Sequence, residues 1–158
     1  MIVRLLSVGA PGKLLAPAIS EFEGRASRYW KFRSETVRAG AGGAAADAEQ
    51  VRVREEARLR ARLAPRGEVL ALTRGGRGMT SQGLARFLER KALAGVPEVA
   101  FLIGGAFGIG STLLEEVDRK LSLSPLTLPH DLARLVLVEQ LYRAGSILRG
   151  EPYHKGEA

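Results

Sequence analysis

The sequence predicts an α/β domain with a mainly parallel sheet, because short apolar runs alternate along the chain with longer amphipathic stretches. The runs over residues 68–73 and 99–103 are almost entirely apolar, which is typical of strands that are covered on both faces. Glycines follow each run closely, as expected where a strand ends in a loop. The chain has 158 residues, the size of one ordinary domain, so we expect a single domain over residues 1–158.

The first part of the chain predicts two strands with a helix between them. Residues 2–8 form an apolar strand ended by Gly9, and an amphipathic helix is expected over about residues 13–29. A weakly alternating strand is expected over residues 32–37. Residues 40–46 contain only glycine and alanine, and we expect this low-complexity linker to be mobile.

A basic helix is expected next, over about residues 47–63. Five arginines contribute to its polar side: Arg52, Arg54, Arg58, Arg60 and Arg62. Such a face is consistent with RNA binding and equally with a solvated surface.

The rest of the chain continues the alternation of strands and helices. The strand over residues 68–73 is expected to end in a turn at residues 75–78, after which Thr80 and Ser81 cap a helix. Ser111 is expected to cap a second helix that runs to about Lys120. The remaining predicted elements are a strand over residues 99–103, a short strand over residues 121–123 and a long apolar helix over residues 130–148.

The net charge points to an anionic partner. Lysine and arginine total 24 against 17 aspartate and glutamate, which gives a formal net charge of +7. A surplus of this size favours nucleic-acid phosphates, although a chain rich in arginine for genomic reasons has the same composition. No cysteine is present, which excludes disulfides, thiolate metal sites and a cysteine nucleophile.

Nothing in the sequence indicates a membrane or an exported protein. No stretch approaches the roughly 20 apolar residues that a membrane helix needs, because Arg134, Glu139 and Arg143 interrupt the longest candidate. The apolar start of the chain lacks a basic leader, so it is interpreted as a strand. We therefore expect a cytoplasmic protein.

Three loops that follow predicted strands are candidates for a ligand site. They cover residues 72–76, 104–110 and 124–129, and in open α/β sheets ligands bind beyond the carboxyl ends of the strands. Glycines allow a flat ligand to approach the backbone, and at Gly105 a Cβ is expected to occupy the slot. Prolines at 125 and 129 are expected to hold the third loop extended. Taken singly, these residues are equally typical of ordinary turns.

Several common sites can be excluded or have little material. The segment Gly105–Thr112 has Ser111 where a phosphate-binding P-loop needs lysine, and no G-x-G-x-x-G fingerprint is present. Only two histidines occur, so we expect no metal site and no Ser-His-Asp triad.

The last third of the chain carries a specific pattern of motifs. It consists of Leu102-Ile103-Gly104-Gly105, the string Leu121-Ser122-Leu123-Ser124-Pro125-Leu126-Thr127-Leu128-Pro129-His130, the helix residues Glu139-Gln140-Leu141-Tyr142-Arg143-Ala144, and the tail Pro152-Tyr153-His154-Lys155. In order and spacing these residues resemble the RlmH family of the SPOUT superfamily. The likeness extends more loosely to the start and middle of the chain.

The resemblance implies a fold and an activity. The fold is a single-domain α/β trefoil-knot (SPOUT) fold, with the knot and tail over about residues 100–158, in a two-fold homodimer. The activity is transfer of a methyl group from S-adenosylmethionine to N3 of a pseudouridine in 23S ribosomal RNA of the large subunit. N3 lies on the pairing edge of the base, so a paired base must be exposed before it reacts.

The resemblance also assigns roles to residues of this chain. The cofactor contacts it implies are Leu72, Gly105, Ser124, Pro125, Leu126, Thr127, Leu128 and Pro129. The candidates for the base that removes the N3 proton are His130, Glu139 and His154, which we do not rank. The expected RNA contacts are Arg134, Arg143, Tyr153 and Lys155, since guanidinium groups suit phosphates and aromatic rings stack on bases.

Two features depart from the family pattern: Ala106-Phe107 in the second loop, and the glycine-alanine linker in place of a lysine-rich segment. Two alternative functions stay open at this point. One is a catalytically silent RNA-binding module, and the other is a SPOUT methyltransferase with a different RNA or protein substrate.

Overall fold

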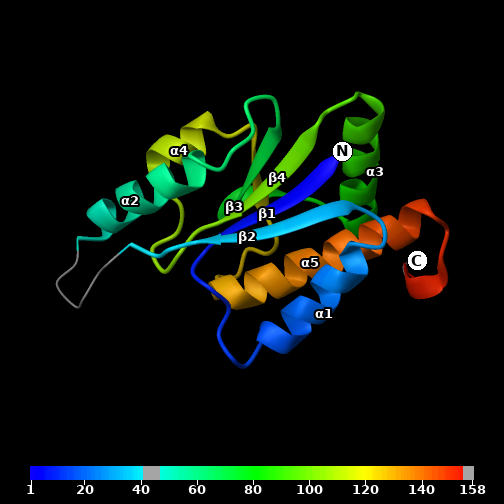
Figure 1. The fold of residues 1–158 in the computed structure, drawn as a ribbon, viewed down its shortest axis with the longest axis horizontal. Helices are drawn as coiled ribbons and strands as arrows, with labels where there is room; N and C mark the ends of the chain where they lie inside the picture. The colour runs from blue at the N-terminus through cyan, green and yellow to red at the C-terminus, as the bar shows by residue number, and fades with distance from the viewer. Residues whose placement is uncertain (41–46, 155–158) are drawn as a thin grey trace.

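The computed structural model describes residues 1–40 and 47–154. Five parallel strands form one sheet in the order β2-β1-β4-β3-β5 (Figure 1). The strands are β1 (Ile2–Val8), β2 (Lys31–Val37), β3 (Glu68–Gly78), β4 (Glu98–Ile103) and β5 (Arg119–Ser122). The helices are α1 (Ala16–Ala26), α2 (Ala48–Arg60), α3 (Ser81–Leu93), α4 (Ser111–Glu116), α5 (His130–Leu148) and the 3-10 turn η1 (Pro152–His154). The predicted α/β class with a parallel sheet is confirmed.

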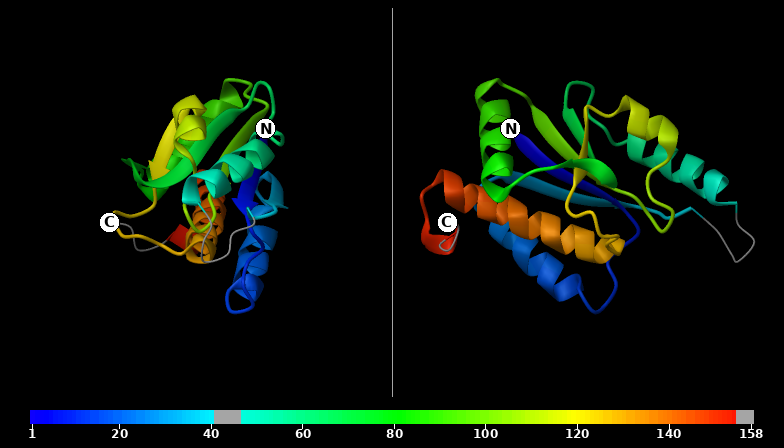
Figure 2. Two further views of the ribbon diagram at one scale, coloured as in Figure 1. Left: turned by 90° about the vertical axis from the view of Figure 1, so that its left-hand side faces the viewer. Right: turned by 180° about the vertical axis from the view of Figure 1, so that it is seen from behind.

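Helices cover both faces of the sheet, and alternate residues of the central strands enter two separate cores. Leu5 of β1 belongs to the core shared with α1, α3 and α5, whereas the next residue, Leu6, packs with α2 and α4. Two views of the ribbon show the sheet between these layers (Figure 2). Every residue of β4 is buried, as the continuous apolar run predicts for a strand covered on both faces.

The strand β3 is longer than predicted. It continues through residues 75–78, where we expected a turn, and pairs with β5 beyond an irregularity that places both Leu72 and Arg77 opposite Leu121. A Cβ on Gly76 would lie 2.7 Å from backbone atoms of β5, so glycine is required there for the close approach of the two strands. The glycines that indicated a turn instead permit this bulge.

Other boundaries shift by a few residues. The expected helix over 13–29 is shorter, and the expected helix over 111–120 ends at Glu116 because residues 119–122 join the sheet. Thr80 caps α3 as predicted, accepting a hydrogen bond from the N–H of Gly83 at 2.9 Å. The predicted cap at Ser111 is wrong, since Gly110 occupies that position without a side-chain bond. Apart from Gly40, the linker expected to be mobile lies outside the described residues.

Charged side chains close the amino ends of the strands. Glu68, at the start of β3, accepts hydrogen bonds from Lys91 and from Arg119 Nε, the latter at 2.9 Å. Burial alone would raise the pKa of Glu68, but these two cations outweigh burial and lower its pKa. Buried Glu98 pairs with Arg4 through two hydrogen bonds of 2.8 and 2.9 Å. Both glutamates at these amino ends are therefore paired with cations. They lie at the end of the sheet opposite to the segments considered next.

No helix within the described residues is both long and apolar enough to cross a membrane.

Candidate functional site

A cavity of about 370 Å³ lies at the carboxyl end of β4 and beside residues 72–74 of β3. Its volume is in the range of small-molecule sites, roughly 300–1,000 Å³. All three segments singled out from the sequence contribute to its lining, although residues 72–76 belong to β3 and do not form a loop. The lining residues are Leu72, Thr73, Arg74, Ile103, Gly104, Gly105, Ala106, Phe107, Gly108, Ile109, Leu123, Ser124, Leu126, Thr127, Leu128, His130 and Ala133. Six of the eight predicted cofactor residues are thus brought together, while Pro125 and Pro129 lie in the same loop but outside the lining.

The loop after β4 is folded tightly by glycine. The N–H of Gly108 donates to the carbonyl of Gly105 at 3.0 Å, and Gly108 has a φ of +74°, a conformation that other residues rarely adopt. A Cβ on Gly104 would come within 2.5 Å of the backbone of Gly108. The loop consequently presents backbone groups to the cavity with few side chains in the way.

A buried carboxylate supports this loop from behind. A Cβ on Gly105 would lie 2.9 Å from both carboxylate oxygens of Glu55 and 3.0 Å from Val8 Cγ1. Our expectation that a Cβ at this position would occupy the slot is therefore wrong, since it points to the α2 side of the loop. Glu55 is 3% exposed and accepts a hydrogen bond from the N–H of Gly40 at 2.9 Å. Its Oε2 has no hydrogen-bond partner in the part of the chain that the structure describes.

Serine side chains shape the loop before α5. Ser124 Oγ accepts a hydrogen bond from the N–H of Leu126 at 3.0 Å, and Ser122 Oγ donates to the carbonyl of Ser124 at 3.0 Å. The hydroxyl of Thr127 accepts a hydrogen bond from Arg74 Nη1 at 3.0 Å, which joins this loop to the end of β3. Pro129 has a φ of −54° and a ψ of 147°, an extended backbone at the start of α5, and the role expected for Pro125 stays a prediction.

Nearly the whole sequence matches a protein-family model. Residues 1–154 match the family described as "Predicted SPOUT methyltransferase". The chain belongs to the SPOUT methyltransferase family. This SPOUT chain is 47% identical to the ribosomal RNA large subunit methyltransferase H of Gemmatimonas aurantiaca, with 98% of this chain and 100% of the relative covered. It is 45% identical to the protein of the same name from Anaeromyxobacter sp. (strain Fw109-5), with 98% of this chain and 100% of the relative covered.

Solved structures share the SPOUT fold. The crystal structure of a probable methyltransferase from Bordetella pertussis Tohama I superposes with a TM-score of 0.55 at 19% identity, over 90% of this chain and 95% of that one. A Legionella pneumophila structure with the cofactor S-adenosylmethionine bound superposes with a TM-score of 0.50 at 14% identity, over 91% of this chain and 66% of that one. At these identities the likeness concerns the fold, and it confirms the SPOUT fold class predicted from the sequence.

The three candidate bases are not brought together within one SPOUT chain. His130, the first residue of α5, lines the cavity, and its Nε2 lies 3.1 Å from Asp131 Oδ1 without hydrogen-bond geometry. Glu139 lies nine positions further along α5, about 13 Å away at 1.5 Å per residue. Its carboxylate accepts hydrogen bonds from Arg143 Nη2 at 2.6 Å and from Tyr153 Oη at 3.1 Å. The side chain of His154 lies outside the described part.

The carboxyl-terminal tail lies at the far end of α5 from the cavity. This helix has 19 residues and is therefore about 28 Å long. The ring of Tyr153 packs on Tyr142 with centroids 4.4 Å apart, and the guanidinium of Arg143 lies 5.0 Å from its centroid. Burial and the negative charge of Glu139 raise the pKa of Tyr153, so its hydroxyl stays protonated. Figure 2 shows the tail and the start of α5 on opposite sides of the molecule.

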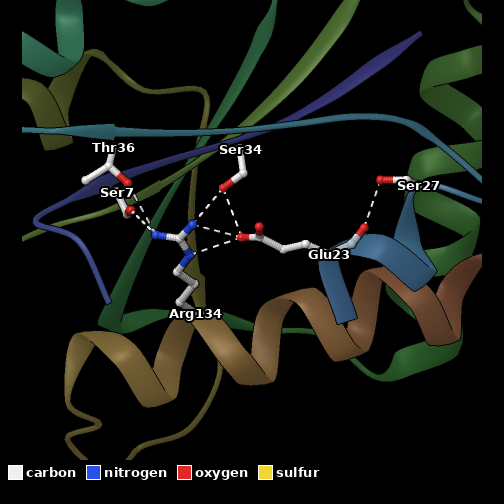
Figure 3. A network of polar contacts seen from close by, with 6 residues as sticks. All are labelled: Ser7, Glu23, Ser27, Ser34, Thr36 and Arg134. Carbon is white, nitrogen blue, oxygen red and sulfur yellow. Dashed lines mark hydrogen bonds and ion pairs between the residues drawn. The ribbon is translucent and has the colours of Figure 1, made fainter. Parts of the chain in front are cut away.

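Arg134 occupies a buried network instead of the surface (Figure 3). It is 7% exposed, and its Nη2 donates to Glu23 Oε1 and to Ser34 Oγ, each at 2.8 Å. Its Nη1 donates to Ser7 Oγ at 2.9 Å. Arg134 thus ties α5 to α1, β1 and β2. The expected contact of Arg134 with RNA stays a prediction, and this buried geometry does not support it. The side chain of Arg143 is 25% exposed and is therefore more accessible. Lys155 lies outside the described residues.

The arginines of α2 and Arg62, which follows this helix, are engaged within the chain. Arg52 pairs with Glu49, Arg60 with Glu116 and Arg62 with Glu35. Arg58 donates to the carbonyls of Arg38 and Ala39 at 2.7 and 2.9 Å. RNA binding by this face stays a prediction, and it would compete with these contacts.

Metal ligands are not clustered in residues 1–40 and 47–154: no group of three or more His, Cys, Asp or Glu side chains there is arranged to hold an ion.

Proposed function

We propose that this SPOUT chain uses S-adenosylmethionine to methylate N3 of a pseudouridine in 23S ribosomal RNA. The observation that carries the proposal is the convergence of Leu72, Gly105 and Ser124 on one cavity, although they lie on separate loops. The relatives from Gemmatimonas and Anaeromyxobacter are named for methylation of large-subunit ribosomal RNA. A net charge of +7 favours an RNA partner.

The cavity fits the cofactor in size and in chemistry. Apolar side chains such as Leu72, Ile103 and Leu128 suit the faces of an adenine ring. The glycine loop after β4 and the backbone of residues 124–128 offer N–H and carbonyl groups, which pair with the polar edge of a purine.

The chemistry required of the protein is mainly positioning. The cofactor supplies a methyl group that is already activated by the sulfonium charge. With both ligands bound, the cavity-lining residues would have to orient the methyl donor toward the base, and a side chain would have to accept the proton of N3. Of the three base candidates, His130 is the one that lines the cavity among the described residues.

We infer that the functional unit is a homodimer in which the tail of one chain completes the cavity of the other. Within one chain, Tyr153 is separated from the cavity by the length of α5, about 28 Å. A two-fold arrangement that packs the α5 helices together brings each tail toward the cavity loops of the partner. Tyr153, His154 and Lys155 are then available to the target nucleotide. This proposal places the enzyme in the cytoplasm, with its ribosomal substrate.

Incubation of the purified protein with ribosomes or with free 23S RNA from cells lacking this gene tests the function. Mass spectrometry of RNA fragments is expected to show one new methyl group on a pseudouridine when S-adenosylmethionine is present. Salt-sensitive RNA binding without cofactor binding would instead indicate a silent RNA-binding module. Cofactor binding with methylation of another RNA or of a protein would indicate a different SPOUT substrate.

A further inference from the structure

Among the described residues that line the cavity, Arg74 is the one with a permanently charged side chain. It is exposed and follows the buried part of β3. Its Nη1 donates to Thr127 Oγ1 at 3.0 Å, so the guanidinium joins β3 to the loop before α5. No ion pair joins Arg74 to a carboxylate of residues 1–40 or 47–154, whereas Arg60 and Arg119 each pair with a glutamate.

The charge of the cavity selects one part of the cofactor. The lining contains no aspartate or glutamate, so Arg74 is its one fixed charge, and the carboxylate of Glu55 lies behind the lining on the far side of Gly105. S-adenosylmethionine carries a sulfonium, an α-ammonium and an α-carboxylate. A fixed cation repels the first two groups and attracts the third, and a guanidinium presents paired donors that match a carboxylate.

We propose that Arg74 binds the α-carboxylate of S-adenosylmethionine and fixes the amino-acid end of the cofactor at the mouth of the cavity. The inference rests on the proposed function, because it assigns a contact within the same site. The bond from Nη1 to Thr127 holds the guanidinium against the third loop and leaves Nη2 and Nε for the ligand. An RNA phosphate is the competing anion. The attachment to Thr127 favours the cofactor, because it keeps the charge over the cavity.

Titration calorimetry with two ligands tests the assignment. S-adenosylmethionine and decarboxylated S-adenosylmethionine differ only by the α-carboxylate. The variants are Arg74→Met, Thr127→Val and the control Arg77→Met, which removes an exposed arginine from the same strand but outside the cavity lining. Circular dichroism and thermal unfolding verify that each variant is folded.

Arg74→Met is expected to weaken binding of S-adenosylmethionine about tenfold, the effect of losing a charge-assisted hydrogen bond to a part-exposed group. Its affinity for the decarboxylated compound is expected to stay within about twofold of the wild type, by the same scale. Arg77→Met is expected to change neither affinity.

Three results would overturn the assignment. An equal loss for both ligands, reproduced by Thr127→Val, means that Arg74 only secures the loop. Unchanged affinity for both ligands with weakened RNA binding means that Arg74 contacts a phosphate. If the wild-type protein binds neither compound, the proposed function fails together with the assignment, which separates that outcome from the first two.

Discussion

Replacement of Arg134 by methionine is expected to destabilise the fold more than any surface arginine replacement. The substitution removes the guanidinium donors to Glu23, Ser34 and Ser7 while keeping much of the side-chain volume, and Ser34 Oγ remains as a donor to Glu23 Oε1 at 2.9 Å. The side chain of Arg134 is 8% exposed and that of Glu23 is 21% exposed. Breaking a buried ion pair costs about 3–5 kcal/mol, because the remaining charge loses its partner. Since Glu23 retains some contact with solvent, we expect about 3 kcal/mol.

Urea unfolding followed by circular dichroism measures this free energy directly. For a domain of this size, 3 kcal/mol corresponds to a fall in Tm of about 6–12 °C. Glu23→Gln and the double variant complete a mutant cycle, in which the double variant is expected to cost clearly less than the sum of the single ones. Arg134→Lys keeps the charge but not the forked geometry, and it is expected to recover only part of the loss. A cost below about 1 kcal/mol for Arg134→Met, or additive single effects, would refute the reasoning.

Three further predictions concern the loop after β4, the ion pairs and the tail. Gly105→Ala is expected to lower the free energy of unfolding by about 1–3 kcal/mol, because its Cβ meets Glu55. In a Glu55→Ala background the same substitution is expected to cost distinctly less. Equal costs in the two backgrounds would contradict this contact. The pKa of Glu68 is lowered in the folded state, so its stabilising contribution is present above its ordinary pKa of 4.5 and is lost as the pH falls through the folded value. Urea unfolding is therefore expected to give a larger free energy of unfolding for the wild type than for Glu68→Gln at pH 7. This difference is expected to disappear only toward pH 3. Truncation after Arg149 is expected to preserve cofactor binding by calorimetry but to abolish RNA methylation. A truncated protein that methylates RNA as fast as the full-length chain would argue against a shared site.

The sequence predicts best those elements whose pattern is local. The apolar runs of β1 and β4 and the long helix α5 appear where expected, because burial of a whole strand or helix face is encoded in consecutive residues. The end of β3 was missed because Gly75 and Gly76 are typical of turns, and only the distant strand β5 makes them part of the sheet. Local chemistry cannot reveal a pairing partner more than 40 residues away.

The sequence predicted the backbone segments of the candidate site better than the contacts of its charged side chains. The three loops converge as the parallel topology requires, since their strands end at the same edge of the sheet. Glu55 was missed because a glutamate on an arginine-rich helix has the appearance of a solvated residue. Arg134 was assigned to RNA because a guanidinium suits phosphates. Its partner Glu23 lies 111 positions earlier in the chain, so nothing near Arg134 in the sequence indicates an ion pair.

The strand order has a consequence for folding of the chain during translation. β1 lies between β2 and β4, and its register with β4 joins Ile2 to Glu98 and Ser7 to Ile103. During translation the first strand can pair with β2, but its other edge stays open until β4 has left the exit tunnel. The core under α5 closes later still, when residues 130–148 emerge. Such long-range closure makes folding slow and leaves apolar strands exposed in the nascent chain. The amino-terminal half is therefore expected to depend on chaperones until nearly the whole chain has been synthesised.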